Sequence, residues 1–234
     1  MDELVKNRFK LIVQCRIGSL RLPGKVLFNF YQETVFDRIL KIAKKIAKKK
    51  DIIFLLGEKN VCSVLGDKCD KHGVNYEYCN KGYEDDLYSR YKVYLSKLNK
   101  SYDFFIRMTA DNYLIQPLVV KKMIKDFISN KWDYSYVKPL SHYACEIVKI
   151  DSFLNNLDYN RENLEHITPS FRNKKKKFKI KSYNQNFYKI DHTKSITLDT
   201  IKDLIFLKKI EAARLCKKID CIPHIKKIEK WKKA

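Results

Sequence analysis

The sequence predicts an α/β protein with a mostly parallel central sheet and helices on both of its faces. Apolar runs of strand length alternate along the chain with longer segments whose apolar residues recur at helical spacing. Such alternation is typical of βαβ units, in which each helix returns the chain to a parallel sheet. No stretch is rich enough in Gly, Pro or Ser to divide the chain, so we expect one domain over residues 1–234.

The first half of the chain alternates regularly between the two patterns. Strands are expected where apolar residues run together or alternate with polar ones, at residues 9–15, 51–57 and 74–78. Helices are expected where apolar residues recur every three or four positions, at residues 34–50, 60–73 and 83–99. Thr34 is placed to cap the first helix, and Gly73 to end the second.

The second half begins in the same way and then becomes less regular. After an expected strand at 103–109, Pro117 opens an expected helix that ends near residue 130. A strand at 133–137 follows. Beyond about residue 140 we expect shorter elements: helices at 152–157 and 162–173, a strand at 177–183, and a strand at 195–198 that leads into a long helix.

The predicted sheet also predicts where a ligand binds. In sheets of this kind, ligands bind beyond the carboxyl ends of the strands. Three connections begin there: the loop at 16–25, the turn after strand 103–109, and the segment after strand 133–137. We therefore expect the functional site where these three segments meet.

The composition is strongly basic. Lys and Arg number 49 against 27 Asp and Glu, which gives a formal net charge of +22. Such an excess suits a nucleic-acid-binding protein, but here it is mostly lysine spread along the chain, with no RNP motif and no zinc finger. We interpret it as a solvated lysine surface and expect no nucleic-acid partner.

The cysteines and the termini bear on the compartment. The seven cysteines form no C-x-x-C pair and no Cys/His spacing typical of a metal site. The first residues lack the apolar stretch of a signal peptide, and no apolar run approaches the ~20 residues that span a bilayer. We expect a cytoplasmic protein with reduced thiols and no membrane insertion.

The stretch QCRIGSLRLPGK, residues 14–25, combines two glycines with three positive charges. Gly18 and Gly24 let the backbone turn tightly and approach a ligand. Arginine forks match phosphate oxygens and a lysine ammonium acts on them as a point charge, so Arg16, Arg21 and Lys25 suit a phosphate group. The alternative is a solvated basic turn. In either case we expect Lys25 to face solvent.

Two better-known phosphate loops do not fit this stretch. The G-x-G-x-x-G pattern of a dinucleotide site is absent. A P-loop has four residues between its glycine and Gly-Lys, followed by Ser or Thr. Here five residues separate Gly18 from Gly24, and Val26 follows Lys25. The sequence therefore predicts neither a Rossmann dinucleotide site nor a Walker NTPase.

Two acidic residues are expected on the same rim. Asp111 follows strand 103–109, and Asp199 follows strand 195–198. Two carboxylates facing arginines and a lysine suit a Mg²⁺ that bridges to a nucleoside triphosphate. Without a ligand, two such carboxylates would repel each other. Each also has a structural alternative: Asp111 can form a turn through its side chain, and Asp199 can cap the last helix.

These motifs resemble a known family. IVQCRIGSLRLPGKVL is similar to the pattern Q-A-R-x-G-S-x-R-L-P-G-K of cytidylyltransferases of the spore-coat-polysaccharide (SpsF) type, with Cys15 where alanine is common. These are relatives of the acylneuraminate and keto-deoxy-octulosonate cytidylyltransferases. The resemblance continues in order through YEDDLYSRY, IRMTADNYLIQP, LEHITPSFRN and ITLDTIKDLIFLKKI. Tyr113 replaces the family's proline, and Lys202 stands where an acid is usual.

The resemblance implies a fold and an activity. The fold is a three-layer sandwich of the nucleotide-diphosphosugar-transferase type. The activity is transfer of CMP from CTP to a sugar or sugar-acid acceptor, with release of pyrophosphate, for surface-polysaccharide or glycan biosynthesis. Asp111 and Asp199 would hold Mg²⁺ and, with Arg16 and Lys25, carry catalysis. The nucleotide would contact Arg16, Gly18, Ser19, Arg21, Lys25, Arg107, Ala110 and Asp111.

The acceptor side is implied by fewer residues. Glu146 and His166 would face the acceptor, while Arg107 is as well placed to pair with a carboxylate. Weaker candidates are His142, Glu165 and Arg172. Alternatives are a nucleotidyltransferase for another base or acceptor, such as a phosphorylated polyol or amino sugar, and a non-catalytic nucleotide-binding module. Many members of the family are dimers, so a homodimer is compatible with the resemblance.

Overall fold

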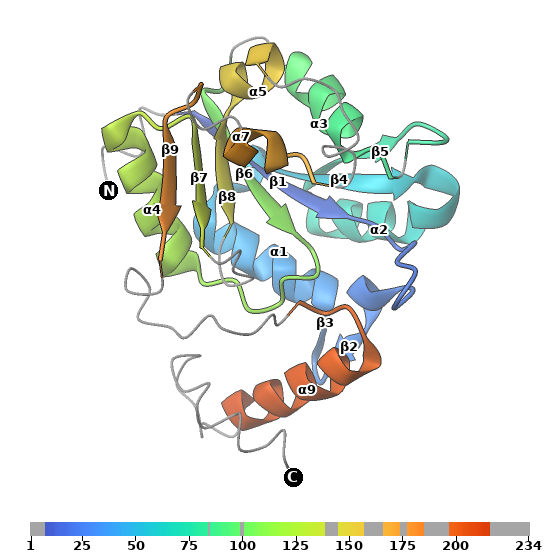
Figure 1. The fold of residues 1–234 in the computed structure, drawn as a ribbon. Helices are drawn as coiled ribbons and strands as arrows, with labels where there is room; N and C mark the ends of the chain where they lie inside the picture. The colour runs from blue at the N-terminus through green and yellow to red at the C-terminus, as the bar shows by residue number, and fades with distance from the viewer. Residues whose placement is uncertain are drawn as a thin grey trace.

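A computed structural model describes residues 8–83, 85–98, 101–138, 145–156, 166–173, 177–184 and 197–215. Its centre is a seven-stranded sheet in the order β5-β4-β1-β6-β8-β7-β9 (Figure 1). The strands are β1 (Phe9–Cys15), β4 (Ile52–Glu58), β5 (Asn75–Cys79), β6 (Phe104–Thr109), β7 (Tyr134–Val137), β8 (Glu146–Lys149) and β9 (Ile180–Tyr183). Only β8 of these strands runs against its neighbours. The prediction of a mostly parallel sheet is confirmed.

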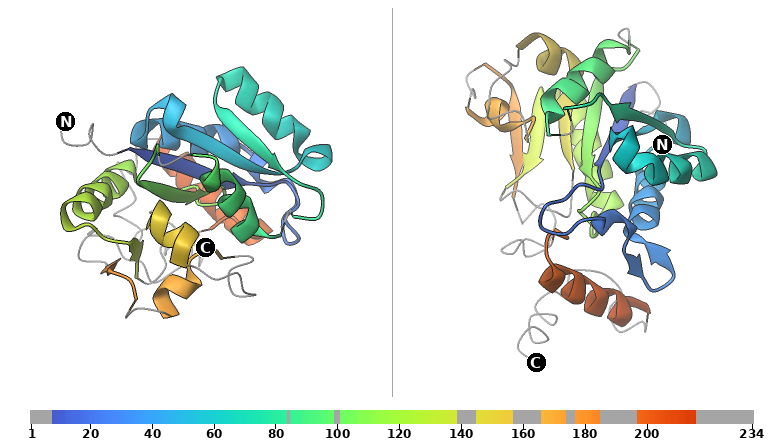
Figure 2. Two further views of the ribbon diagram at one scale, coloured as in Figure 1. Left: turned by 90° about the horizontal axis from the view of Figure 1, so that it is seen from above. Right: turned by 90° about the vertical axis from the view of Figure 1, so that its right-hand side faces the viewer.

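Helices cover both faces of this sheet and make three layers (Figure 2). One face carries α1 (Val35–Ile46), α2 (Lys59–His72) and α4 (Pro117–Asn130). The other carries α3 (Leu87–Ser96), α5 (Ile150–Asn156) and α7 (Pro169–Asn173). Successive side chains of a strand point to opposite faces, so Leu11 and Val13 of β1 belong to the first core and Ile12 to the second. All three side chains are fully buried.

Several local signals act as the sequence predicts. The Thr34 hydroxyl accepts from the Asp37 N–H, and the Asp37 carboxylate accepts from the Thr34 N–H, which closes a capping box at α1. Gly73 ends α2 with φ 56°, in the left-handed region that favours glycine. Pro117 is the first residue of α4. Helix α1 ends at Ile46, earlier than expected, because a 3-10 turn, η3 (Lys49–Asp51), precedes β4.

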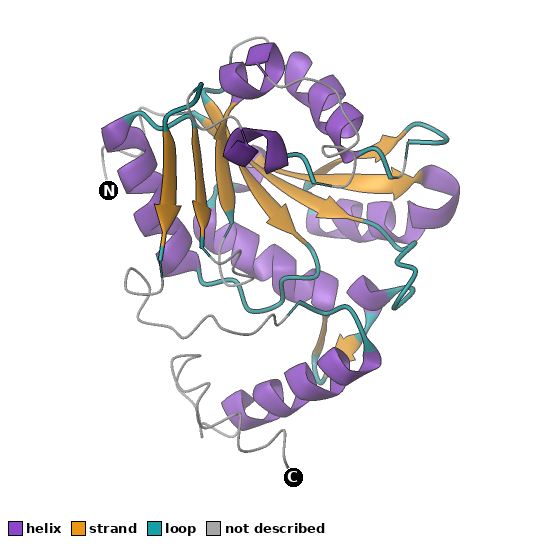
Figure 3. Cartoon of the chain, in the orientation of Figure 1, coloured by secondary structure: helices purple, strands orange, loops and turns teal. Residues whose placement is uncertain are grey.

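Short elements were missed or misplaced by the sequence analysis. A hairpin of β2 (Asn29–Phe30) and β3 (Glu33–Thr34) follows the basic loop, and β8 was not expected. Thr197 and Leu198 lie in irregular structure, so the expected strand there is wrong for those two residues. Of the expected helix 162–173, only α7 is helical among its described residues. Figure 3 distinguishes the strands, helices and loops of the described residues by colour.

The last described helix, α9 (Ile201–Leu215), lies outside the two helical layers, beside the β2–β3 hairpin (Figure 1). The Tyr31 hydroxyl of the hairpin is 3.5 Å from the carbonyl oxygen of Lys208. Leu207 and Ile210 of α9 are buried in the first core. This packing fixes where α9 begins and so places the residues just before it.

In the part of the chain that the structure describes, no helix is both long and apolar enough to cross a membrane.

Candidate active site

A cleft of about 690 Å³ opens beyond the carboxyl ends of the strands. It is bounded by the loop after β1, the turn after β6, the ends of β7 and β8, and the segment before α9. The loop at 16–25 and the turn after strand 103–109 therefore meet as expected, while most of the segment expected after strand 133–137 lies outside the described residues. Every residue predicted for the site lines this cleft except Gly18: Arg16, Ser19, Arg21, Lys25, Arg107, Ala110, Asp111, Glu146, His166 and Asp199.

The basic loop is held in shape by its own backbone. The carbonyl oxygen of Ile17 accepts from the N–H of Ser19 at 2.8 Å and of Gly24 at 3.0 Å. Gly24 has φ 68°, which an L-residue rarely adopts. It is followed by a 3-10 turn, η2 (Lys25–Leu27), which turns the Lys25 side chain inward. Gly24, rather than Gly18, is therefore the glycine on whose positive φ this loop depends.

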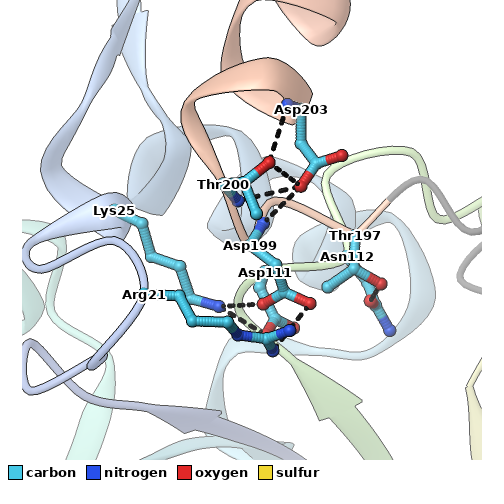
Figure 4. Close-up of polar contacts among 8 residues, drawn as sticks. All are labelled: Arg21, Lys25, Asp111, Asn112, Thr197, Asp199, Thr200 and Asp203. Carbon is cyan, nitrogen blue, oxygen red and sulfur yellow. Dashed lines mark hydrogen bonds and ion pairs between the residues drawn. The ribbon is translucent and has the colours of Figure 1, made fainter.

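Lys25 lies between the two predicted metal ligands (Figure 4). Its Nζ donates to Oδ2 of Asp111 at 2.8 Å and to Oδ1 of Asp199 at 2.9 Å. Arg21 completes the group, with Nη2 at 3.0 Å from the other oxygen of Asp199. Lys25 is only 8% exposed, so the expectation that it faces solvent is wrong. The two carboxylates share one buried ammonium, which offsets their mutual repulsion.

Asp199 is not the cap of the last helix. Thr200 fills that position: its hydroxyl accepts from the Asp203 N–H at 3.3 Å, and Asp203 accepts from the Thr200 N–H at 2.8 Å. The backbone N–H of Asp199 also points to Asp203. The carboxylate of Asp199 is thus left to face Lys25 and Arg21 (Figure 4). The pattern T-x-x-D at 200–203 is the signal in the sequence that could have found this cap.

Asp111 is fixed by its place after β6. The Leu198 N–H donates to the Asp111 carbonyl oxygen at 3.0 Å, which holds the segment before α9 against this turn. Burial alone would raise the pKa of the Asp111 carboxyl, but the Lys25 ammonium and a hydrogen bond from Thr109 outweigh it. The pKa therefore lies below its ordinary value. Asp111 is ionised at neutral pH, as a metal ligand or a partner of Lys25 must be.

The carboxylates of the cleft can be compared with the ligands that Mg²⁺ prefers. Within the described ranges, no three His, Cys, Asp or Glu side chains come together as a metal cluster. Two carboxylates converge on one position, that of the Lys25 ammonium. Mg²⁺ is typically held by one or two carboxylates together with water and substrate phosphates. The pair of Asp111 and Asp199 fits such an ion and does not fit a metal held by protein ligands alone.

Glu146, at the start of β8, is saturated by protein donors. Arg107 Nη1 contacts its Oε2, and Tyr134, Thr168 and Arg172 all donate to its Oε1. Burial would raise the pKa of this carboxyl, but Arg107 first, and then the hydrogen bonds from Tyr134 and Thr168, hold the pKa below its ordinary value. Arg107 therefore pairs with a carboxylate, the second of the two roles considered for it.

Arg172 and His166 also line the cleft, and Arg172 contacts Glu146. Nη1 of Arg172 is 2.8 Å from the Tyr134 hydroxyl, and its guanidinium lies 5.5 Å from the ring centre of Tyr136. His166 is exposed and lines the cleft. Arg172, one of the weaker candidates, also lines the cleft. Two weaker candidates, His142 and Glu165, lie outside the described residues.

With this geometry the chain can be compared with known proteins. A family model for cytidylyltransferases matches residues 11–230. The chain belongs to the cytidylyltransferase family. Among curated relatives, it is 28% identical to an uncharacterized protein of Methanocaldococcus jannaschii over 82% of this chain and 78% of the relative. It is 27% identical to the spore coat polysaccharide biosynthesis protein SpsF of Bacillus subtilis, over 56% of this chain and 54% of that protein.

Two solved structures have the same fold. A cytidylyltransferase from Leptospira borgpetersenii serovar Hardjo-bovis is 25% identical, with a TM-score of 0.76 over 86% of this chain and 85% of that one. A CMP:2-keto-3-deoxy-manno-octonic acid synthetase in complex with CTP is 12% identical, with a TM-score of 0.64 over 89% of this chain and 100% of that one. The resemblance seen in the sequence is confirmed at the level of family and fold.

The family motif YEDDLYSRY contributes residues that the sequence analysis did not assign. Asp85 forms an ion pair with Arg16 at the rim of the cleft. Arg90, on α3, is buried and donates from Nη2 to the carbonyl oxygens of Leu55 at 2.8 Å and Leu56 at 2.7 Å. Asp85 and Arg90 both line the cleft, on the side of β4. The motif itself was the available signal, since charges cluster in it, but only the fold brings it to the loop after β1.

Proposed function

We propose that this protein transfers CMP from CTP to a sugar or sugar-acid acceptor, releases pyrophosphate, and serves polysaccharide or glycan biosynthesis. The observation that carries the proposal is the convergence of Asp111, Asp199, Lys25 and Arg21 at one point of the cleft. Two carboxylates and two cations that meet in this way suit a metal-bound triphosphate. Membership of the cytidylyltransferase family supports it, as does the name of the Bacillus subtilis relative.

The reaction is a substitution at the α-phosphorus of CTP. A hydroxyl oxygen of the acceptor forms the new bond to phosphorus and loses its proton to water, while the bond to the β-phosphate bridging oxygen breaks and pyrophosphate leaves. Lys25, Arg21 and Arg16 would bind the phosphates and offset the charge that gathers on pyrophosphate. Mg²⁺, held by Asp111 and Asp199, would supply further charge neutralisation. Catalysis then rests on positioning and electrostatics, without a covalent intermediate.

The acceptor would lie against the part of the cleft that is lined by Glu146, His166 and Arg172. Glu146 already accepts hydrogen bonds from four protein groups. Its proposed role is therefore to position Arg107 and Arg172 rather than to contact the acceptor directly. The guanidinium of Arg172 is fixed by these bonds and lines the cleft beside His166. Both side chains would donate hydrogen bonds to hydroxyl or acid groups of the acceptor.

The base would lie on the opposite side of the triphosphate, toward β4. The sheet order places β6 and β8 on one side of β1 and β4 on the other. The acceptor takes the first side, which leaves Asp85 and Arg90 for the nucleoside. Cytosine presents an amino donor beside two acceptors, and carboxylates accept well from that amino group. Asp85 would therefore accept from the cytosine amino group, while its ion-pair partner Arg16 binds the phosphates.

A nucleotide screen tests base choice. CTP with Mg²⁺ is expected to raise the melting temperature more than ATP, GTP or UTP, because a ligand at ~100 times its dissociation constant stabilises the folded state by ~2.7 kcal/mol. Pyrophosphate release with candidate acceptors then separates an enzyme from a non-catalytic module. A clearly larger shift with UTP or GTP would show that the protein serves another base.

Asp85→Asn is expected to weaken the preference for CTP over UTP by about tenfold or more, since one good polar contact discriminates bases by ~1–3 kcal/mol. The asparagine amide can turn its N–H toward the uracil oxygen that a carboxylate repels. The measurement is the ratio of kcat/KM for the two nucleotides. Asp67→Asn, an exposed carboxylate of α2, controls for the loss of one negative charge. An unchanged ratio in Asp85→Asn would remove this residue from base recognition.

A further inference from the structure

Lys25 occupies the position at which a cation would bridge Asp111 and Asp199. Its Nζ lies 2.8 Å from one carboxylate and 2.9 Å from the other (Figure 4). We propose that Lys25 is the resident cation of this pair in the nucleotide-free protein, and that the divalent metal binds there only together with the nucleotide. This inference rests on the proposed function and adds to it an order of binding.

The charges around the pair explain why metal alone would bind weakly. Asp111 and Asp199 are balanced by the ammonium of Lys25 and the guanidinium of Arg21. A divalent cation that arrives alone meets a neutral group and has to displace an ammonium that already lies between the carboxylates. Its attraction to the two carboxylates is therefore largely cancelled.

Burial makes the displacement depend on a new anion. Lys25 is 8% exposed, and a buried ammonium that loses its counter-ions is strongly unfavourable. The loop backbone is pinned by the bonds from Ser19 and Gly24 to the Ile17 carbonyl, so the side chain alone has to move. Phosphate oxygens offer the ammonium replacement partners within the same cleft. When the nucleotide enters, the lysine exchanges carboxylate for phosphate, and the carboxylates become available to the metal.

Lys25 is the residue on which the exchange depends. Among the described residues, it is the one cation that contacts both carboxylates. Arg21 contacts Asp199 alone, and its side chain is 69% exposed. Removal of the lysine charge should therefore convert a neutral group into one with a net negative charge, in which Arg21 still contacts Asp199 and which binds a divalent cation without nucleotide.

The test is a titration of the nucleotide-free protein with Mn²⁺. Binding is measured by calorimetry and by the loss of the electron paramagnetic resonance signal of the free ion. Lys25→Met keeps the stem and removes the charge, and it is expected to bind Mn²⁺ about tenfold or more tighter than the wild type. Lys41→Met is the matched control, because it removes one lysine charge from Glu33 outside the cleft. Equal or weaker Mn²⁺ binding in Lys25→Met would overturn the inference.

Two further arms keep the inference testable. Asp111→Asn added to Lys25→Met should abolish the gain; if the gain persists, Mn²⁺ binds elsewhere and the inference fails. If Lys25→Met does not fold, the wild type decides. Submillimolar Mn²⁺ binding to nucleotide-free wild type that Asp111→Asn removes would show that the metal needs no nucleotide, whereas absence of such binding supports the exchange. No nucleotide is present in these titrations, so a failure of CMP transfer would be seen separately, in the pyrophosphate assay.

Discussion

Asp111→Asn and Asp199→Asn are each expected to lower the turnover for pyrophosphate release by about 10²-fold or more, and the double variant should be little worse than either. Both carboxylates would hold one ion, so the loss of either leaves the triphosphate poorly neutralised. Groups that act as a unit have strongly non-additive effects. The measurement is pyrophosphate release from CTP over a range of Mg²⁺ concentrations for the wild type, both single variants and the double variant.

The same variants decide whether the pair works as a pair. Asp67→Asn, on an exposed position of α2, controls for the lost charge and should keep the wild-type rate. If Asp199→Asn kept both the rate and the Mg²⁺ dependence of the wild type, Asp199 would not be a metal ligand, and the proposal that the two carboxylates share one ion would be wrong. Neither variant is expected to gain stability without ligand, because Lys25 already offsets the repulsion between the carboxylates.

Lys25→Met is expected to lower turnover by about 10²- to 10³-fold, which is the loss typical of removing one preorganised group that stabilises charge in a transition state. Methionine retains the aliphatic stem, so the change isolates the ammonium. The measurement is kcat for pyrophosphate release, with circular dichroism to confirm the fold. Lys48→Met is the control, since Lys48 is exposed and outside the cleft. A comparable loss in the control would mean that net charge, rather than the position of Lys25, matters.

Lys25→Met should also change how stability depends on pH. In the wild type the pKa of Asp111 lies below its ordinary value, chiefly because Lys25 outweighs the effect of burial. The ion pair therefore stabilises the fold at pH values above the ordinary carboxyl pKa, and that contribution is lost as the pH falls through the lowered pKa. Without Lys25, burial and Asp199 raise the pKa of Asp111, so the variant should be less stable than the wild type at neutral pH. Urea denaturation of the wild type and the variant, from neutral pH down to below the ordinary carboxyl pKa, measures the difference in their free energies of unfolding.

The parts of the fold that depend on local chemistry were predictable. Strand β1, the helix cap at Thr34, the helix stop at Gly73 and the helix start at Pro117 follow from runs of apolar residues and from single residues with strong backbone preferences. The hairpin of β2 and β3 and the four-residue strand β8 were not predictable in this way. Elements so short are stabilised by the residues packed against them rather than by their own sequence.

The site divides in the same manner. The sequence by itself determined which charged residues stand at the ends of strands, and hence that Arg16, Lys25 and Asp111 belong to one rim, because the carboxyl ends of parallel strands meet at one edge of a sheet. Only the tertiary structure decided that Lys25 is buried between Asp111 and Asp199 and that Asp85 meets Arg16. The physical reason is that burial and ion pairing arise between segments far apart in the chain, whose distances no local pattern records.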